Sequence, residues 1–154
     1  MNTHHDFEEL LRLLEENHVE YMIVGGYAVA FHGYPRFTKD IDIFFESSRE
    51  NVERLRKALS EFGFNEPEMT EDVFLTKGNI LSFGVEPVRI DLINDIDGVS
   101  FRQARPNVIR GKYGSRAVNF IGMSDLIKNK KSTPRARDKA DVEELMKQKD
   151  KYAP

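Results

Sequence analysis

Three aspartates lie in stretches that otherwise have the pattern of β-strands. Asp40 and Asp42 stand two residues apart in DIDIFF, and Asp91 lies inside RIDLI. Strand interiors disfavour Asp, and clustered like charges repel each other, so cations would stabilise such a group. Carboxylates together with a substrate phosphate supply the oxygen ligands that Mg²⁺ prefers. The three aspartates therefore indicate a metal site for one or, as we expect, two Mg²⁺ ions, with Mn²⁺ as the alternative, and phosphoryl-transfer chemistry.

A glycine pair, Gly25-Gly26, comes directly after the β-branched and aromatic run 19–24. Glycines at this place permit a tight turn, and they also let the backbone approach a phosphate beside a helix N-terminus. Taken alone, each part has a plainer explanation: a turn, an exposed strand edge, or an ion pair of Asp91 with Arg89 or Arg36. The order of strand, Gly-Gly, short helix, Asp-X-Asp strand and later Asp favours a phosphate and metal site.

Hydrophobic periodicity predicts the elements that position these residues. Helical spacing of apolar residues indicates helices, while alternation and β-branched runs indicate strands. The Glu86-Pro87 pair between two strand-like runs predicts an antiparallel hairpin, and Ser124 is a candidate N-cap. We expect helices at about 6–17, 27–32, 48–62, from 124, and at 136–149, with strands at 19–24, 40–45, 80–85, 88–93, 107–109 and 117–120. The fold class is therefore α/β in the α+β sense, a mixed, mostly antiparallel sheet with packed helices.

Length and composition restrict the class of protein. The 154 residues predict one domain over 1–154, and 40% hydrophobic residues suffice for a core. No apolar run approaches the ~18 residues of a membrane span, and the first residues lack the features of a secretory signal, so we expect a cytoplasmic protein without a membrane partner. Cysteine is absent, which excludes thiolate chemistry and leaves oxygen or imidazole as metal ligands.

The net charge of −3 gives no general attraction to nucleic acid, although residues 128–139 are strongly basic. This segment is either a solvated helix surface or a surface that faces an anionic ligand. Lys130 would be a suitable point charge for a triphosphate, and Asp138 would complement the dipole of the last helix. Arg36 could hold a phosphate or orient a carboxylate.

The stretch Ile23–Asp42 resembles the nucleotidyltransferase superfamily with the DNA polymerase β-like palm. Leu126–Leu145 also resembles small prokaryotic members, including those related to abortive-infection and toxin–antitoxin nucleotidyltransferases. The resemblance implies a palm-like fold in which the C-terminal helices, about 123–150, complete the cleft. It implies nucleotide contacts by Gly25 and Gly26, where the second glycine replaces a frequent serine.

The same resemblance assigns catalytic and metal-binding roles to Asp40, Asp42 and Asp91, and makes Lys130 and Asp138 candidates for nucleotide or acceptor contacts. The implied reaction moves a nucleoside monophosphate from an NTP to an acceptor hydroxyl and releases pyrophosphate. The acceptor is an RNA end, a protein side chain or a small molecule, and a cognate partner protein is a further expectation. The alternative is a non-catalytic or partner-dependent interaction module of a toxin–antitoxin-like pair.

Overall fold

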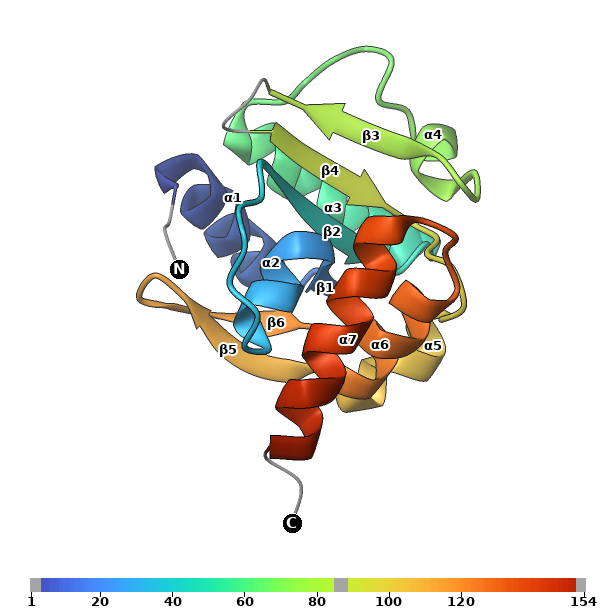
Figure 1. The fold of residues 1–154 in the computed structure, drawn as a ribbon. Helices are drawn as coiled ribbons and strands as arrows, with labels where there is room; N and C mark the ends of the chain where they lie inside the picture. The colour runs from blue at the N-terminus through green and yellow to red at the C-terminus, as the bar shows by residue number, and fades with distance from the viewer. Residues whose placement is uncertain (1–3, 85–88, 152–154) are drawn as a thin grey trace.

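A six-stranded mixed sheet lies at the centre of the computed structural model, which describes residues 4–84 and 89–151 (Figure 1). The strand order is β3-β4-β2-β1-β6-β5. Three neighbouring pairs are antiparallel, whereas β2–β4 and β1–β6 are parallel. This confirms the predicted mixed, mostly antiparallel sheet. The strands are β1 (Tyr21–Val24), β2 (Asp40–Phe45), β3 (Ile80–Phe83), β4 (Arg89–Ile93), β5 (Ile109–Tyr113) and β6 (Arg116–Phe120).

Helices cover both faces of the sheet. In Figure 1, α3 lies behind β2 and β4, whereas α2 and α7 lie on the near side. The two C-terminal helices, α6 and α7, contact each other, and α1 contacts α3. None of the described helices combines the length and apolar character needed to cross a membrane. The helices are α1 (His5–Glu16), α2 (Gly25–Phe31), α3 (Arg49–Phe62), α4 (Glu71–Leu75), α5 (Phe101–Ala104), α6 (Met123–Lys131) and α7 (Ala136–Lys151), with a 3₁₀ turn, η1 (Arg105–Asn107).

Helix α3 is fixed to the sheet by its caps and by one buried amide. The Ser48 side chain accepts a hydrogen bond from the Asn51 N–H at the N-terminus, and Gly63 ends the helix in the left-handed region at φ 110°. The Asn51 side chain accepts from the Glu20 N–H at 2.7 Å and donates to the carbonyls of Glu20 and Glu46 at 3.0 and 2.7 Å. One side chain thus joins the start of β1 and the end of β2 to α3.

Several boundaries differ from the prediction. Ser124 lies inside the first turn of α6, and the N-cap is Gly122, which makes the predicted Ser124 cap wrong. A Cβ at Gly122 would lie 2.5 Å from the Asn107 carbonyl oxygen, so this close approach leaves no room for a side chain at the N-cap. Strand β5 lies later than predicted, and α4 and α5 were not foreseen. The predicted hairpin of β3 and β4 is confirmed, while its Glu86-Pro87 turn lies outside the described residues.

Candidate active site

The three aspartates lie together because β2 and β4 are parallel neighbours. Asp42 is the register partner of Asp91, and Asp40 precedes Asp42 by two residues on the same strand. Residues two apart on a strand point to the same face, and register partners share that face. The structure therefore brings the three predicted carboxylates onto one face of two adjacent strands.

The environment of Asp42 opposes a full negative charge. Burial raises the pKa of this carboxyl to about 7, with further contributions from the charges of Asp91 and Asp40 and a hydrogen bond with Asp91. The positive charge of Lys130 acts in the opposite direction. A divalent cation would offset the same repulsion, so the site is electrostatically suited to one.

Asp91 is oriented by two donors. The Ser82 hydroxyl on β3 donates to Asp91 Oδ1 at 2.6 Å, and Arg89 Nε donates to the same oxygen at 3.2 Å. The ion pair of Asp91 with Arg89, which the sequence analysis considered as an alternative to a metal site, is therefore present. Arg36, the other partner considered, contacts Asp141 instead.

The glycine pair forms the first turn of α2 and leaves room for the site residues. Gly25 has φ +66°, and a Cβ there would lie 2.1 Å from Asp42 Oδ2. A Cβ at Gly26 would lie 2.7 Å from the hydroxyl oxygen of Thr38. The Thr38 hydroxyl also donates to the Asp40 carbonyl at 3.3 Å. The absence of side chains at 25 and 26 thus lets the backbone approach Asp42 and Thr38 closely.

Four charged residues tie the C-terminal helices to the segment before β2, and we call them the α6–α7 ion network: Arg36, Lys130, Asp138 and Asp141. Lys130 Nζ lies 2.9 Å from Asp138 Oδ1 and 3.3 Å from Asp141 Oδ2. Arg36 donates two bonds to Asp141, Nε to Oδ1 at 3.0 Å and Nη2 to Oδ2 at 3.1 Å. Lys130 is only 6% exposed, and both aspartates are 1% exposed.

Asp138 receives two further donors, the Thr133 hydroxyl and Arg135 Nε. Burial acts to raise the pKa of Asp138, but the bonds from Thr133, Lys130 and Arg135 outweigh it, and the pKa is lowered. Asp138 is therefore a buried, fully engaged carboxylate in the first turn of α7. Asp141 was missed from the sequence, because nothing in the local pattern reveals its pairing with Arg36 over 105 positions.

One open cavity of about 800 Å³ contains the site. All eight site residues predicted from the sequence line it, contributed by β2, β4, α2, α6, α7 and the segment before β2. Phe37, which is 79% exposed, and Ile80 add apolar surface to the lining. These two residues, and Asp95 after β4, were not singled out from the sequence.

The donor set suits Mg²⁺ by chemistry, since all three side chains offer carboxylate oxygens and no His, Cys or Met is among the described residues that line the cavity. Within 4–84 and 89–151, however, no three Asp, Glu or His side chains are already gathered as a complete metal-binding group. The aspartates fit a metal whose remaining ligands come from a bound substrate, because Mg²⁺ commonly retains ligands outside the protein.

Two nearby residues, whose side chains could in principle take part in catalysis or binding, have structural roles instead. His32 Nε2 lies 2.7 Å from the Ile121 carbonyl oxygen, and burial lowers its pKa. Tyr27 is buried, and its ring packs against Phe7 and Tyr113. Both belong to the support of α2.

A mixed sheet that presents an Asp-X-Asp strand beside a third Asp strand, next to a glycine-started helix, defines the nucleotidyltransferase class. The chain belongs to the family described as nucleotidyl transferase of unknown function (DUF2204), whose model matches residues 3–152. This confirms the superfamily resemblance. Among curated proteins, none matches the sequence significantly.

Solved nucleotidyltransferase structures share the fold. A Thermotoga maritima protein described as a nucleotidyltransferase (TM1012) aligns with TM-score 0.61 and 13% identity over 92% of this chain and 90% of its own. ANT(2'')-Ia in complex with adenylyl-2''-tobramycin aligns with TM-score 0.59 and 16% identity over 92% and 86%. The lincosamide adenylyltransferase LnuA, bound to lincomycin, aligns with TM-score 0.54 and 16% identity over 95% and 98%.

Proposed function

We propose that this protein transfers a nucleoside monophosphate from an NTP to an acceptor hydroxyl with the help of Mg²⁺. The observation that carries the proposal is the register pairing of Asp42 with Asp91, with Asp40 on the same face, in a cavity that the glycine pair also lines. In the reaction, the acceptor oxygen forms a bond to the α-phosphorus while the bond from that phosphorus to the bridging oxygen breaks. Pyrophosphate leaves, and the hydroxyl proton passes to a carboxylate.

The three aspartates and the glycine pair each have a role in this proposal. Asp40 and Asp42 would hold the metal ions, and Asp91 would complete the second metal site and take the proton of the acceptor hydroxyl. Bound Mg²⁺ supplies Lewis acidity and neutralises charge on the phosphates. The Gly25 and Gly26 backbone approaches the triphosphate, as their lack of side chains permits. Ser82 and Arg89 keep Asp91 in a fixed orientation.

A small-molecule acceptor is one candidate that the fold neighbours suggest. Two of them were solved with antibiotics bound, ANT(2'')-Ia with adenylyl-2''-tobramycin and LnuA with lincomycin. The cavity of this chain is of the size that holds small ligands, at about 800 Å³. Its apolar lining by Phe37 and Ile80 would suit an acceptor with apolar surface.

Calorimetric titration with each of the four NTPs, with and without Mg²⁺, tests the proposal. We expect one or more NTPs to bind the wild type in a metal-dependent manner, and binding to be lost in Asp40→Asn and Asp42→Asn. Asp95→Asn is the matched control, because it removes a carboxylate of the same cavity outside the three-aspartate group. Unchanged metal-dependent binding in Asp42→Asn would show that the site assignment is wrong.

A further inference from the structure

The basic side chains that line the cavity differ in whether they form ion pairs with carboxylates of the protein. Five basic residues line it: Arg36, Lys39, Lys130, Arg135 and Arg137. The ion network takes up Arg36 and Lys130, and Arg135 is bonded to Asp138. Arg137 makes no ion pair or hydrogen bond with any residue of the described segments 4–84 and 89–151.

The carboxylates closest to Arg137 in sequence are already occupied. Asp141, one helical turn onward at i+4, is the ordinary partner for an arginine on a helix. It is instead bonded to Arg36 and Lys130. Asp138, the adjacent residue, receives Lys130, Thr133 and Arg135. The fold therefore leaves the exposed Arg137 without a carboxylate where one would normally lie.

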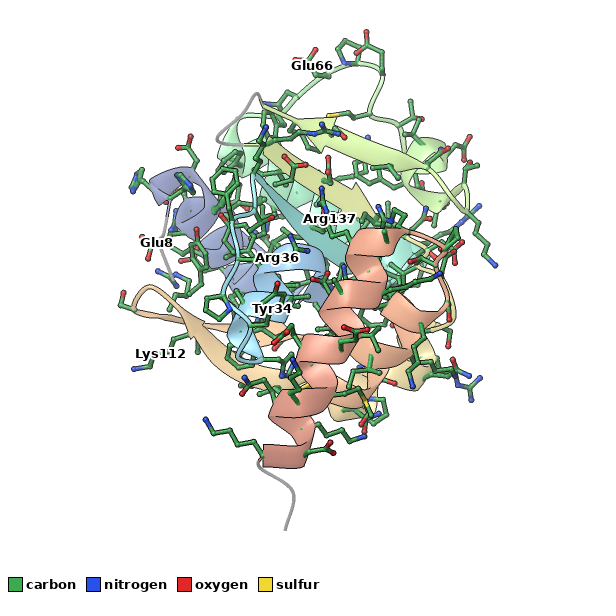
Figure 2. All side chains as sticks on the ribbon, in the orientation of Figure 1. Glu8, Tyr34, Arg36, Glu66, Lys112 and Arg137 are labelled. Carbon is green, nitrogen blue, oxygen red and sulfur yellow. The ribbon has the colours of Figure 1, made fainter. Side chains whose placement is uncertain are left out.

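The position of Arg137 is also unfavourable for local helix stability. It lies in the first turn of α7, where the helix dipole disfavours a positive charge. Figure 2 shows Arg137 at the start of α7, and it lines the same cavity as Asp40 and Asp42 of β2. A residue that contradicts local preference and faces a functional cavity is a candidate for ligand binding.

We propose that Arg137 binds the β- and γ-phosphates of the NTP, and that Arg36, Lys130 and Asp138 are positioning residues that hold α7 so that it presents Arg137. The inference rests on the proposed function. A guanidinium can bind two phosphate oxygens at once through charge-assisted hydrogen bonds. The charge of Arg137 is not neutralised by the network, because the two carboxylates of the network are already paired with three other cations.

The test compares wild type, Arg137→Ala and Lys139→Ala in calorimetric titrations with ATP, ADP and AMP in Mg²⁺, or with the series of whichever base the wild type prefers. Lys139 is the matched control, since it is exposed on the same helix turn and does not line the cavity. We expect Arg137→Ala to weaken triphosphate binding by about 10- to 100-fold, as for lost charge-assisted bonds, and to leave monophosphate binding nearly unchanged. Lys139→Ala should match the wild type.

The outcomes separate this inference from the proposed function. No binding of any NTP by the wild type contradicts the proposed function itself. Wild-type binding that Arg137→Ala retains in full overturns the role of Arg137 alone. An equal loss for tri-, di- and monophosphate also overturns it, because the contact would then be to the α-phosphate or the nucleoside and not to the β- or γ-phosphate. Thermal unfolding of Arg137→Ala should occur at a temperature no lower than that of the wild type, since a positive charge is removed from the helix N-terminus, and this excludes a loss of binding through unfolding.

Discussion

Asp42 is buried beside the carboxylates of Asp91 and Asp40, and the positive charge of Lys130 offsets their effect only in part. Its pKa is raised to about 7 by burial, Asp91 and Asp40, whereas an unfolded chain would titrate this carboxyl at its ordinary value near 3.8. The folded protein therefore binds more protons than the unfolded chain between about pH 4 and pH 7. Stability falls as pH rises through this window, and the loss is complete above pH 7.

We predict that Asp42→Asn is more stable than the wild type at pH 8, by up to about 4 kcal/mol, and that the difference disappears near pH 4. The neutral amide keeps the shape of the side chain and removes the repulsion. Urea unfolding at several pH values in a chelating buffer measures the difference. Asp95→Asn, which is exposed, should show no such pH dependence. A constant difference from pH 4 to 8 would contradict this electrostatic account.

Gly25 is required for two separate reasons, backbone conformation and space. At φ +66° a side chain is strained, and a Cβ would also overlap Asp42 Oδ2. We predict that Gly25→Ala costs about 2–4 kcal/mol and abolishes metal-dependent NTP binding. Gly63→Ala is the control, because its φ of +110° imposes strain while nothing lies within 4 Å. The control should cost about 1 kcal/mol and leave binding intact, and equal losses in both would exclude a specific contact with Asp42.

At the scale of elements, the α6–α7 ion network holds two helices against the segment before β2. Lys130 is the central cation, since it contacts both Asp138 and Asp141. Removing one partner of a buried ion group leaves uncompensated charge, which is more harmful than never having built the group. The network is thus sensitive to the loss of any one of its members, and it lies beside the cavity.

We predict that Lys130→Met destabilises the protein by about 3–5 kcal/mol, because both aspartates would remain buried without their shared cation. Lys128→Met, an exposed change on the same helix, should alter stability by less than about 0.5 kcal/mol. Chemical denaturation of both variants measures the difference. A small effect at Lys130, combined with a large loss of NTP affinity, would instead favour a direct contact of its amine with phosphate.

The elements around the site could be predicted well from sequence. The alternation in DIDIFF predicted β2 with its exact bounds, and the caps at Ser48 and Gly63 predicted α3. The register of Asp42 with Asp91 was not predictable in detail, because strand order depends on packing across the whole chain. The structure gathers the eight predicted residues around one cavity, while their roles remain predictions.

Other features had no local signal in the sequence. Asp141 looked like an ordinary polar residue of a surface helix, since its partner Arg36 lies in a distant segment. Ser124 looked like a cap because its residue type is typical of caps, but the N-cap is Gly122, where the contact with the distant Asn107 leaves room for a glycine alone. In each case a long-range contact overrode a local preference.

At the scale of the whole molecule, charge bears on the choice of acceptor. The net charge is −3, and within the basic segment 128–139 the structure uses Lys130 and Arg135 in bonds to Asp138. An RNA acceptor would need several free cations, because its affinity comes largely from phosphate contacts and the release of counterions. Fewer cations are free than the sequence alone indicated.

We therefore predict that the double variant Lys128→Glu/Lys131→Glu transfers NMP as well as the wild type, and that the wild type binds RNA only weakly at 150 mM salt, with a Kd of about 1–100 µM. Both lysines are exposed on α6 and do not line the cavity, so their reversal leaves the proposed active site intact. Filter binding with single-stranded RNA and a transferred-label assay measure the two quantities. Tight RNA binding with a steep salt dependence, lost in the double variant, would instead identify an RNA end as the acceptor.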